Sequence, residues 1–213
     1  MPRKPATKPR KAASQERSRA TVAALVEATA RILVEEGFDK ASTNRIAEVA
    51  GVSVGSLYQY FPSKEALVLA VIERHNRAVL QLVRGTLEKL DTLPVEAAVR
   101  SLVAVAVEAH RIDPELHCVL AEQIPRTGRL ENVEAATREA HELFRNYLET
   151  RKNELGIPDV KLAAFVCATS IEALAHNAVL HHAAMSSEAA VEALIDEASR
   201  LIVGYLRRNG RTN

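Results

Sequence analysis

The segment 43-TNRIAEVAGVSVGSLYQYF-61 decides the fold of the N-terminal part of this 213-residue chain. Its pattern predicts two short helices that cross steeply at one sharp turn. Ala47 is small enough for the helices to approach closely, Gly51 permits the positive φ that the turn requires, and Leu57 places the second helix in a shared core. The other predicted members of this core are Ile46, Val49 and Val52. The spacing predicts a helix-turn-helix whose second helix lies in a DNA major groove.

Apolar residues recur at helical spacing on both sides of this segment, and no alternating strand pattern is present. We therefore predict an all-α fold of about nine helices, over residues 14–36, 43–50, 54–61, 63–90, 94–111, 114–123, 130–155, 158–184 and 187–208. The expected helix ends carry recognisable cap residues. These are Gly37 as a left-handed C-cap, Gly156 as the end of the helix over residues 130–155, and Ser42 or Thr43, Ser53, Ser63, Asp113 and Ser186 as N-caps.

Basic residues are concentrated at the N-terminus. Residues 1–20 hold seven lysine and arginine side chains and one glutamate, a net charge of +6, whereas the whole chain carries +1. Such a basic end is typical of phosphate binding, and a solvated tail is the alternative. We predict a basic flexible arm over residues 1–14, a three-helix DNA-binding domain over residues 15–70 with its motif at about 42–61, and a larger helical domain over residues 71–213.

The remaining composition excludes several classes of protein. Hydrophobic residues make up 47% of the chain, which is enough for a sizeable core. Cys118 and Cys167 form no Cys-x-x-Cys pair, and no apolar run reaches about 18 residues. The N-terminus also lacks the apolar segment of a secretory signal. We expect a cytoplasmic protein with reduced thiols and no membrane partner.

The second helix of the motif has residues suited to DNA contact. Its first turn is small or polar, so this end can approach base edges closely. Hydroxyl and amine groups around both helices are placed to bind phosphate oxygens. The alternative is that a small three-helix core without DNA-binding function has the same spacing. The predicted DNA-binding residues are Thr43, Asn44, Arg45, Ser53, Val54, Gly55, Ser56, Tyr58, Tyr60 and Lys64.

The motif, together with the run 57-LYQYFPSKEAL-67, resembles the DNA-binding domain of tetracycline-repressor (TetR) family regulators. The resemblance covers roughly residues 16–70, and beyond that only length and helix count are similar. No arginine or glutamine precedes Gln59 in the recognition helix, so Arg45, the basic arm or DNA shape is expected to add specificity. The resemblance implies DNA contacts at Thr43, Asn44, Val54, Gly55, Ser56, Tyr58, Tyr60 and Lys64.

The last two expected helices have apolar stripes wider than a monomer surface needs. We predict that these helices from two subunits form an intermolecular four-helix bundle, because two half-sites about 34–36 Å apart require two linked DNA-binding heads. An ordinary monomer core is the alternative. The predicted homodimer interface residues are Phe165, Ala168, Ile171, Leu174, Val179, Val191, Leu194, Ile195, Ala198, Leu201, Ile202 and Tyr205.

The middle helices are expected to enclose a site for a small-molecule effector. Polar, thiol and aromatic residues lie near their apolar stripes, where such groups orient a ligand in a mostly apolar pocket. A structural role is the alternative for each of them. The predicted ligand-binding residues are Val105, His117, Cys118, Glu122, Phe144, Tyr147, Cys167, Thr169, Glu172 and His176.

The seven histidines raise the question of a metal site. His176 and His181 share an expected helix, but a spacing of five residues rotates one by about 500° relative to the other, unlike the four-residue spacing of helical ligands. We therefore predict no metal and no cofactor. A disulfide between Cys118 and Cys167 has no support from their spacing.

These observations favour a DNA-binding transcriptional regulator over an enzyme, because no nucleophile–base pair, glycine-rich phosphate loop or metal signature is present. The main hypothesis is a ligand-responsive repressor, in which a dimer binds a palindromic double-stranded operator and a small molecule releases it. A DNA-binding activator without an inducer stays open. A helical enzyme or a structural partner-binding protein is the remaining alternative.

Overall fold

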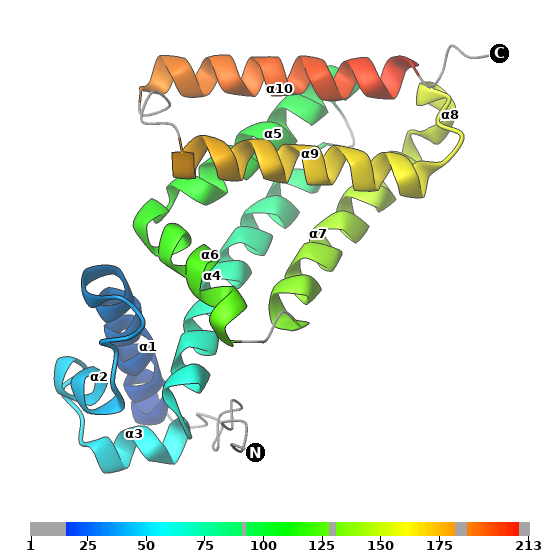
Figure 1. Cartoon of the computed structure of the whole chain (residues 1–213). Helices are drawn as coiled ribbons and strands as arrows, with labels where there is room; N and C mark the ends of the chain where they lie inside the picture. Colours follow the sequence, from blue (N-terminus) through cyan, green and yellow to red (C-terminus); the bar gives the residue numbers. More distant parts are fainter. Residues whose placement is uncertain (1–15, 91–92, 128–130, 182–186, 209–213) are drawn as a thin grey trace. The chain divides into compact units, whose positions relative to one another are not determined.

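The computed structural model describes residues 16–90, 93–127, 131–181 and 187–208, without the side chains of 121–127, 131–137, 179–181 and 208. All regular structure in these residues is α-helical (Figure 1), which confirms the all-α prediction. The helices are α1 (Glu16–Glu36), α2 (Thr43–Val49), α3 (Val54–Tyr60), α4 (Lys64–Leu87), α5 (Val95–Arg111), α6 (Pro114–Thr127), α7 (Glu131–Thr150), α8 (Lys152–Leu155), α9 (Val160–His181) and α10 (Glu188–Arg208). The predicted arm over residues 1–14 lies outside the described residues.

The described residues form ten helices instead of the expected nine or so because one expected helix is interrupted. The helix predicted over residues 130–155 ends at Thr150, and Arg151 has φ −107° and ψ 4°, outside helical geometry. The single turn of α8 follows, and Gly156 ends it at φ +61°, as predicted. None of the described helices is both long and apolar enough to cross a membrane.

Serine side chains cap four of the helices. The backbone N–H of Arg45 donates to Ser42 Oγ at 3.2 Å, so Ser42 rather than Thr43 caps α2. Ser63 Oγ accepts from the N–H of Ala66 at 3.3 Å in the first turn of α4. At α10 the cap is Ser187, whose Oγ accepts from Ala190 N–H at 3.2 Å. The predicted cap, Ser186, is one residue too early and lies outside the described residues. The fourth cap, at α3, belongs to the DNA-binding motif.

The chain divides into two compact units, which are described separately. Unit 1 comprises residues 1–76 and 115–133, and unit 2 comprises residues 77–114 and 134–213. The division falls within α4, at the start of α6 and near the start of α7. Helix α6 therefore belongs to unit 1, although it follows α5 in sequence. The boundary predicted at residue 70 stays a prediction.

Unit 1 has one apolar core, built by α1, α2, α3, α4 and α6. Leu25 and Leu33 of α1 and Leu67 of α4 are fully buried in it. Helix α6 adds Leu116 and Leu120, four residues apart on one helical face. Each fully buried leucine stabilises the fold by about 1.5–3 kcal/mol, so the short helices α2 and α3 are held by this packing rather than by their own propensity.

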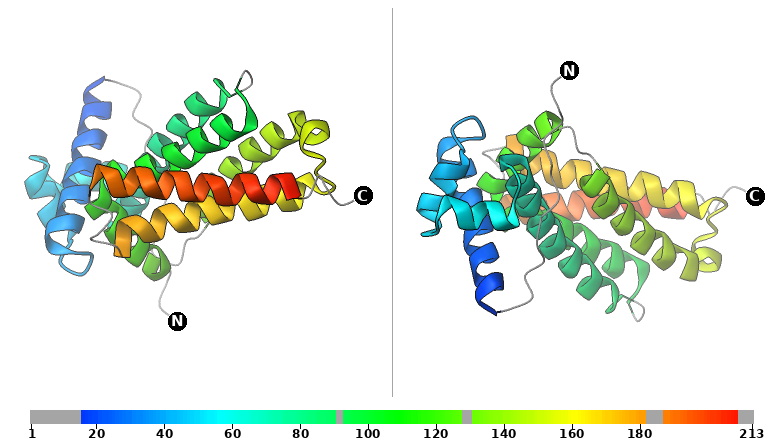
Figure 2. Two further views of the ribbon diagram at one scale, coloured as in Figure 1. Left: turned by 90° about the horizontal axis from the view of Figure 1, so that it is seen from above. Right: turned by 90° about the horizontal axis from the view of Figure 1, so that it is seen from below.

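Unit 2 has a separate core, to which α5, α7, α9 and α10 contribute. Helix α5 packs against both α9 and α10, and α9 and α10 run side by side (Figures 1 and 2). Exposed ion pairs join α5 to α10, including Arg100 with Asp196 at 3.1 Å and Arg207 with Glu96. Exposed pairs add little stability. Glu96 at the start of α5 pairs with Arg207 at the end of α10, and Arg100, further along α5, pairs with Asp196 in the middle of α10. This order means that the two helices are antiparallel.

Candidate nucleic-acid interface

The turn between α2 and α3 has the geometry that the sequence predicted. Gly51 has φ +67°, a conformation that favours glycine. The backbone N–H of Val52 donates to Ala47 O at 3.0 Å and closes the turn. Ala47 is 1% exposed and Leu57 is fully buried, so the two helices meet at a small residue and are fixed by a large one. Val49 and Val52 are partly buried against the same core.

The first turn of α3 presents small groups to solvent. Ser53 Oγ accepts from Ser56 N–H at 3.1 Å and thereby caps α3. Ser53 and Gly55 are exposed, whereas Val54 and Ser56 are half-buried. A Cβ built on Gly55 meets only Ser53 Oγ, at 3.9 Å. This end of α3 therefore allows another surface to approach its backbone closely.

Two hydroxyl groups meet on the exposed side of α2 and α3. Thr43 Oγ1 and Tyr58 Oη are 3.1 Å apart in a hydrogen bond, and Tyr58 is 41% exposed. Asn44 beside them is also exposed. Hydroxyl, phenol and amide groups are the types that bind phosphate oxygens at protein–DNA interfaces. The structure thus brings together three of the residues for which DNA contacts were predicted.

Tyr60 and Lys64 have structural contacts that the sequence did not reveal. Tyr60 is buried, and its hydroxyl is 2.6 Å from Ser18 Oγ of α1. Lys64 Nζ donates to the carbonyl oxygen of Phe38 at 3.0 Å and lies 4.0 Å from the centre of the Phe38 ring. These contacts tie α3 and α4 to α1 and to the chain after it. The phosphate contacts of both residues stay predictions.

Arg45 is exposed but paired with two carboxylates. Its Nε donates to Glu36 Oε1 at 3.1 Å, and its Nη1 donates to Glu48 Oε2 at 3.2 Å. The hydrogen bond to Glu36, followed by that to Glu48, raises the pKa of Arg45 above its usual value. The spacing of Arg45 and Glu48 on α2 could have indicated one pair. The pair with Glu36 depends on the fold, because α1 and α2 are separated by a turn.

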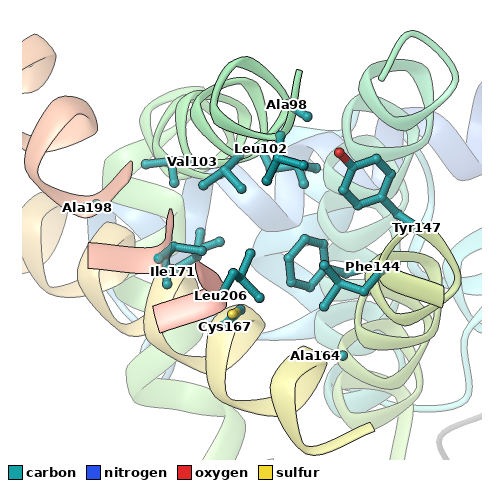
Figure 3. Packing of buried hydrophobic residues seen from close by; sticks show 14 of the residues in the cluster. Ala98, Leu102, Val103, Phe144, Tyr147, Ala164, Cys167, Ile171, Ala198 and Leu206 are labelled. Atoms are coloured by element: carbon teal, nitrogen blue, oxygen red, sulfur yellow. The ribbon is translucent and has the colours of Figure 1, made fainter. Parts of the chain in front are cut away.

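Several predicted ligand-binding residues meet in the core of unit 2 (Figure 3). Phe144 and Tyr147 of α7 are buried and stacked, with ring centroids 6.3 Å apart. Cys167 of α9 is fully buried beside them, and burial raises the pKa of its thiol to about 12. Val105 is half-buried, whereas Thr169 is exposed, so the prediction that Thr169 lines an enclosed site is not supported.

Glu172 and His176 of α9 lie next to His110 of α5. His110 Nε2 is 3.2 Å from Glu172 Oε1, and the His110 and His176 rings are edge to face with centroids 5.8 Å apart. Burial lowers the pKa of His110, but the hydrogen bond and charge of Glu172 outweigh it, so the pKa is raised overall. No local sequence pattern connects α5 with α9, so His110 was not among the predicted site residues.

The other predicted ligand-binding residues are in unit 1. His117 and Cys118 are half-buried on α6, and His117 Nδ1 is 3.4 Å from His75 Nε2 of α4. The side chain of Glu122 lies outside the described residues. The predicted set is therefore divided between the two units.

The predicted dimer residues fall into three groups by exposure. Phe165 and Leu201 are 56% and 58% exposed, and Leu162, which is not in the predicted set, is 55% exposed. Ala168, Leu174, Leu194 and Tyr205 are half-buried, and the side chain of Val179 lies outside the described residues. A third group is at most 7% exposed and packs inside the core of its own chain, so its assignment to the interface is corrected. These residues are Ile171, Val191, Ile195, Ala198 and Ile202.

Comparison with known proteins matches both parts of the chain. Residues 25–71 match the family described as bacterial regulatory proteins, tetR family, and residues 94–206 match the tetracyclin repressor-like C-terminal domain. The chain belongs to the TetR family. It is therefore a DNA-binding transcription regulator, as the helix-turn-helix predicted.

Two curated relatives are similar to this chain in sequence over 40% of its length, and one solved structure is similar to it in fold. SlmA, a nucleoid occlusion factor of Haemophilus ducreyi, is 31% identical over 86 residues, which are 40% of this chain and 42% of SlmA. The transcriptional activator FasR of Mycolicibacterium smegmatis is 40% identical over 85 residues, 40% of this chain and 36% of FasR. This TetR-family chain thus matches less than half of the length of these curated relatives. The fatty acid degradation regulator FadR of Bacillus halodurans has the same fold, with TM-score 0.70 and 19% identity over 88% of this chain and 96% of FadR.

Proposed function

We propose that this TetR-family regulator is a ligand-responsive repressor that binds a palindromic operator as a homodimer. The observation that most directly supports recognition of DNA bases is the exposure of small residues in the first turn of α3. Ser53 and Gly55 are exposed there, and the Thr43–Tyr58 hydroxyl pair lies on the two helices of the same motif. In this proposal α3 lies in the major groove and the hydroxyl pair binds the flanking phosphate backbone.

The distribution of exposed apolar side chains supports dimerisation through α9 and α10. Six large apolar side chains are exposed in the described residues, and Leu162, Phe165 and Leu201 are three of them. All three lie on the two helices that the sequence analysis assigned to a four-helix bundle. Contact with a second copy would remove this apolar surface from water, which is favourable at about 25 cal/mol per Å².

The core of unit 2 supports an effector of mostly apolar character. Among the residues labelled in Figure 3, the Tyr147 hydroxyl and the Cys167 thiol are the polar side-chain groups, and the rest are apolar. A ligand that separates these side chains needs apolar surface and one hydrogen-bonding group for Tyr147. In this proposal the effector binds more tightly to a state in which the DNA-binding units are misplaced for the operator. A coupling free energy of about 1.4–3 kcal/mol between the two sites weakens operator binding roughly 10- to 150-fold.

Footprinting on the DNA that flanks the chain's own gene tests this proposal. We expect protection of two half-sites centred about 34–36 Å apart, and loss of protection when the effector is added. The double variant Thr43→Ala/Tyr58→Phe is expected to weaken operator binding. The control is Thr86→Ala, which changes a threonine of α4 outside the motif. Protection that no compound alters contradicts the effector part, and absence of protection on any DNA contradicts the operator part.

Activation of transcription is the second candidate function, because the relative FasR is named a transcriptional activator. The helix-turn-helix serves either outcome, since the effect depends on where the operator lies relative to the promoter. A promoter–reporter fusion in cells with and without the gene separates the two. Higher reporter expression in the absence of the protein supports repression, and lower expression supports activation.

A further inference from the structure

Gln59 is an exposed polar residue of α3 that is not among the predicted DNA-binding residues. Each residue of an α-helix is rotated by about 100° from the one before it. Leu57 and Tyr60 are buried and Val54 is half-buried, so these three define the side of α3 that faces the core of unit 1. Gly55 and Gln59 are each rotated by about 160° from Leu57. These two residues therefore form the face of α3 that points away from the core.

We propose that Gln59 determines operator specificity by recognising an adenine in the major groove of each half-site. The side-chain amide of glutamine has one acceptor and one donor group, and adenine presents the complementary pair at its major-groove edge. In this contact Nε2 of Gln59 donates to N7 of the base, and Oε1 accepts from the N6 amino group. The inference rests on the proposed function, in which α3 lies in the major groove of an operator.

Gly55 leaves space for this contact. A long side chain of a helix lies over the turn that precedes its own Cα, and Gly55 is four residues before Gln59 on the same face. Gly55 has no side chain, and a Cβ built on it meets only Ser53 Oγ, at 3.9 Å. Helix α3 itself therefore places no side chain between the Gln59 amide and the base edges.

The hydroxyl groups near Gln59 are already hydrogen-bonded within the motif. Tyr58 Oη is 3.1 Å from Thr43 Oγ1, and Ser53 Oγ donates to Ser56 Oγ at 3.0 Å. No hydrogen bond of the Gln59 side chain is formed among the described residues. A contact between Gln59 and a base thus replaces water and breaks no hydrogen bond of this part of the protein.

A contact between Gln59 and a phosphate group is the alternative. Tyr58 is rotated by about 100° from Gln59 and faces α2, where it meets Thr43. The proposed phosphate contacts are made on that side, whereas Gln59 lies on the outer face of α3. The two roles have different consequences, because loss of a phosphate contact weakens binding to all sequences alike and loss of a base contact changes the preference at one base pair.

Selection of bound sequences from a randomised double-stranded DNA library by the full-length protein tests the assignment. We expect the wild-type protein to select an A·T pair at one position of each half-site, and Gln59→Ala to accept all four pairs there while the other positions are unchanged. On the wild-type site, Gln59→Ala should bind about five- to 150-fold more weakly. The matched control is Gln81→Ala, which changes an exposed glutamine of α4 outside the motif and should keep both affinity and preference.

The variant Gln59→Glu gives a second measurement. A carboxylate accepts hydrogen bonds and donates none, so it fits the N4 amino group of cytosine, and the preferred pair should change from A·T to C·G. Both substitutions at Gln59 change an exposed side chain, so thermal unfolding should give a Tm close to that of the wild-type protein.

The outcomes separate this inference from the proposed function. If both variants at Gln59 keep the A·T preference, with or without a uniform loss of affinity, the assignment is overturned and the proposed operator binding stands. Loss of preference at a G·C pair in Gln59→Ala, or an equal loss in Gln81→Ala, also overturns the assignment. If the wild-type protein selects no sequence, the operator proposal is overturned as well.

Discussion

At the scale of single residues, the predicted DNA-binding residues include a cation that is already paired. Arg45 lies between Glu36 and Glu48, at 3.1 and 3.2 Å. Exposed pairs of this kind stabilise a fold little. They matter for binding, because a DNA phosphate that contacts Arg45 has to replace at least one of the two carboxylates. Arg45 was predicted as a DNA contact from sequence, but its competition with Glu36 follows only from the fold.

We expect Glu48→Gln to bind operator DNA about two- to threefold more tightly than the wild-type protein, because Arg45 then loses one competing carboxylate. Glu35→Gln is the matched control: it makes the same charge change in α1, where Glu35 faces Arg31. Fluorescence anisotropy titrations at low salt measure both variants. Equal affinities for the variant and the control would show that Arg45 plays no part in binding.

The variant Tyr60→Phe tests whether Tyr60 has a packing role or contacts DNA. Because its buried hydroxyl pairs with Ser18 at 2.6 Å, Tyr60→Phe is expected to lower the free energy of unfolding by about 1 kcal/mol. The slope of log affinity against log salt should stay the same, since a lost phosphate contact would reduce it by about one. Urea unfolding and salt-dependent DNA titrations provide the two values. A reduced slope with unchanged stability would instead establish the phosphate contact predicted from sequence.

At the scale of elements, local sequence signals located the helix-turn-helix to within one residue. Ser42, Gly51 and Ser53 each fix a helix end through their own backbone or side chain, so the signal lies in the sequence itself. The break between α7 and α8 has no such marker, because Arg151 is an ordinary helical residue. The membership of α6 in unit 1 also has no local cause. It results from Leu116 and Leu120 packing against residues far away in sequence.

The α2–α3 turn permits a test with a matched pair of glycines. Gly51 has φ +67° and nothing within 4 Å of a built Cβ, so Gly51→Ala is expected to destabilise by about 1–2 kcal/mol through backbone strain alone. Gly85 is in the last turn of α4, without a positive φ and with the same free space, so Gly85→Ala should stabilise by about 0.5–1 kcal/mol. Thermal unfolding measures both. A Tm increase in the Gly51 variant would mean that the turn does not require positive φ.

At the scale of the whole molecule, the sequence located the helices but did not show which of their residues are exposed. The apolar stripes on α9 and α10 were correctly located, yet periodicity does not distinguish a side that packs in its own core from a side that meets a partner. Ile202 of the same stripe is buried in unit 2, whereas Leu201 is exposed. For the same reason Phe144, Cys167 and Thr169 were all predicted to line the effector site, although Phe144 and Cys167 are buried and Thr169 is exposed.

If the protein dimerises through α9 and α10, loss of the dimer should affect binding to a full operator and to a single half-site differently. Changing Phe165 and Leu201 together to glutamate places charges on the proposed interface, so sedimentation equilibrium should show monomers. Binding to a full operator should weaken at least about tenfold, because the second DNA-binding unit is no longer held near its half-site, while binding to a single half-site should not change. Leu82→Glu, an exposed leucine of α4, is the control and should remain dimeric. If the double variant stays dimeric while the control dissociates, the interface lies elsewhere, and the exposed side chains of α9 and α10 need another explanation.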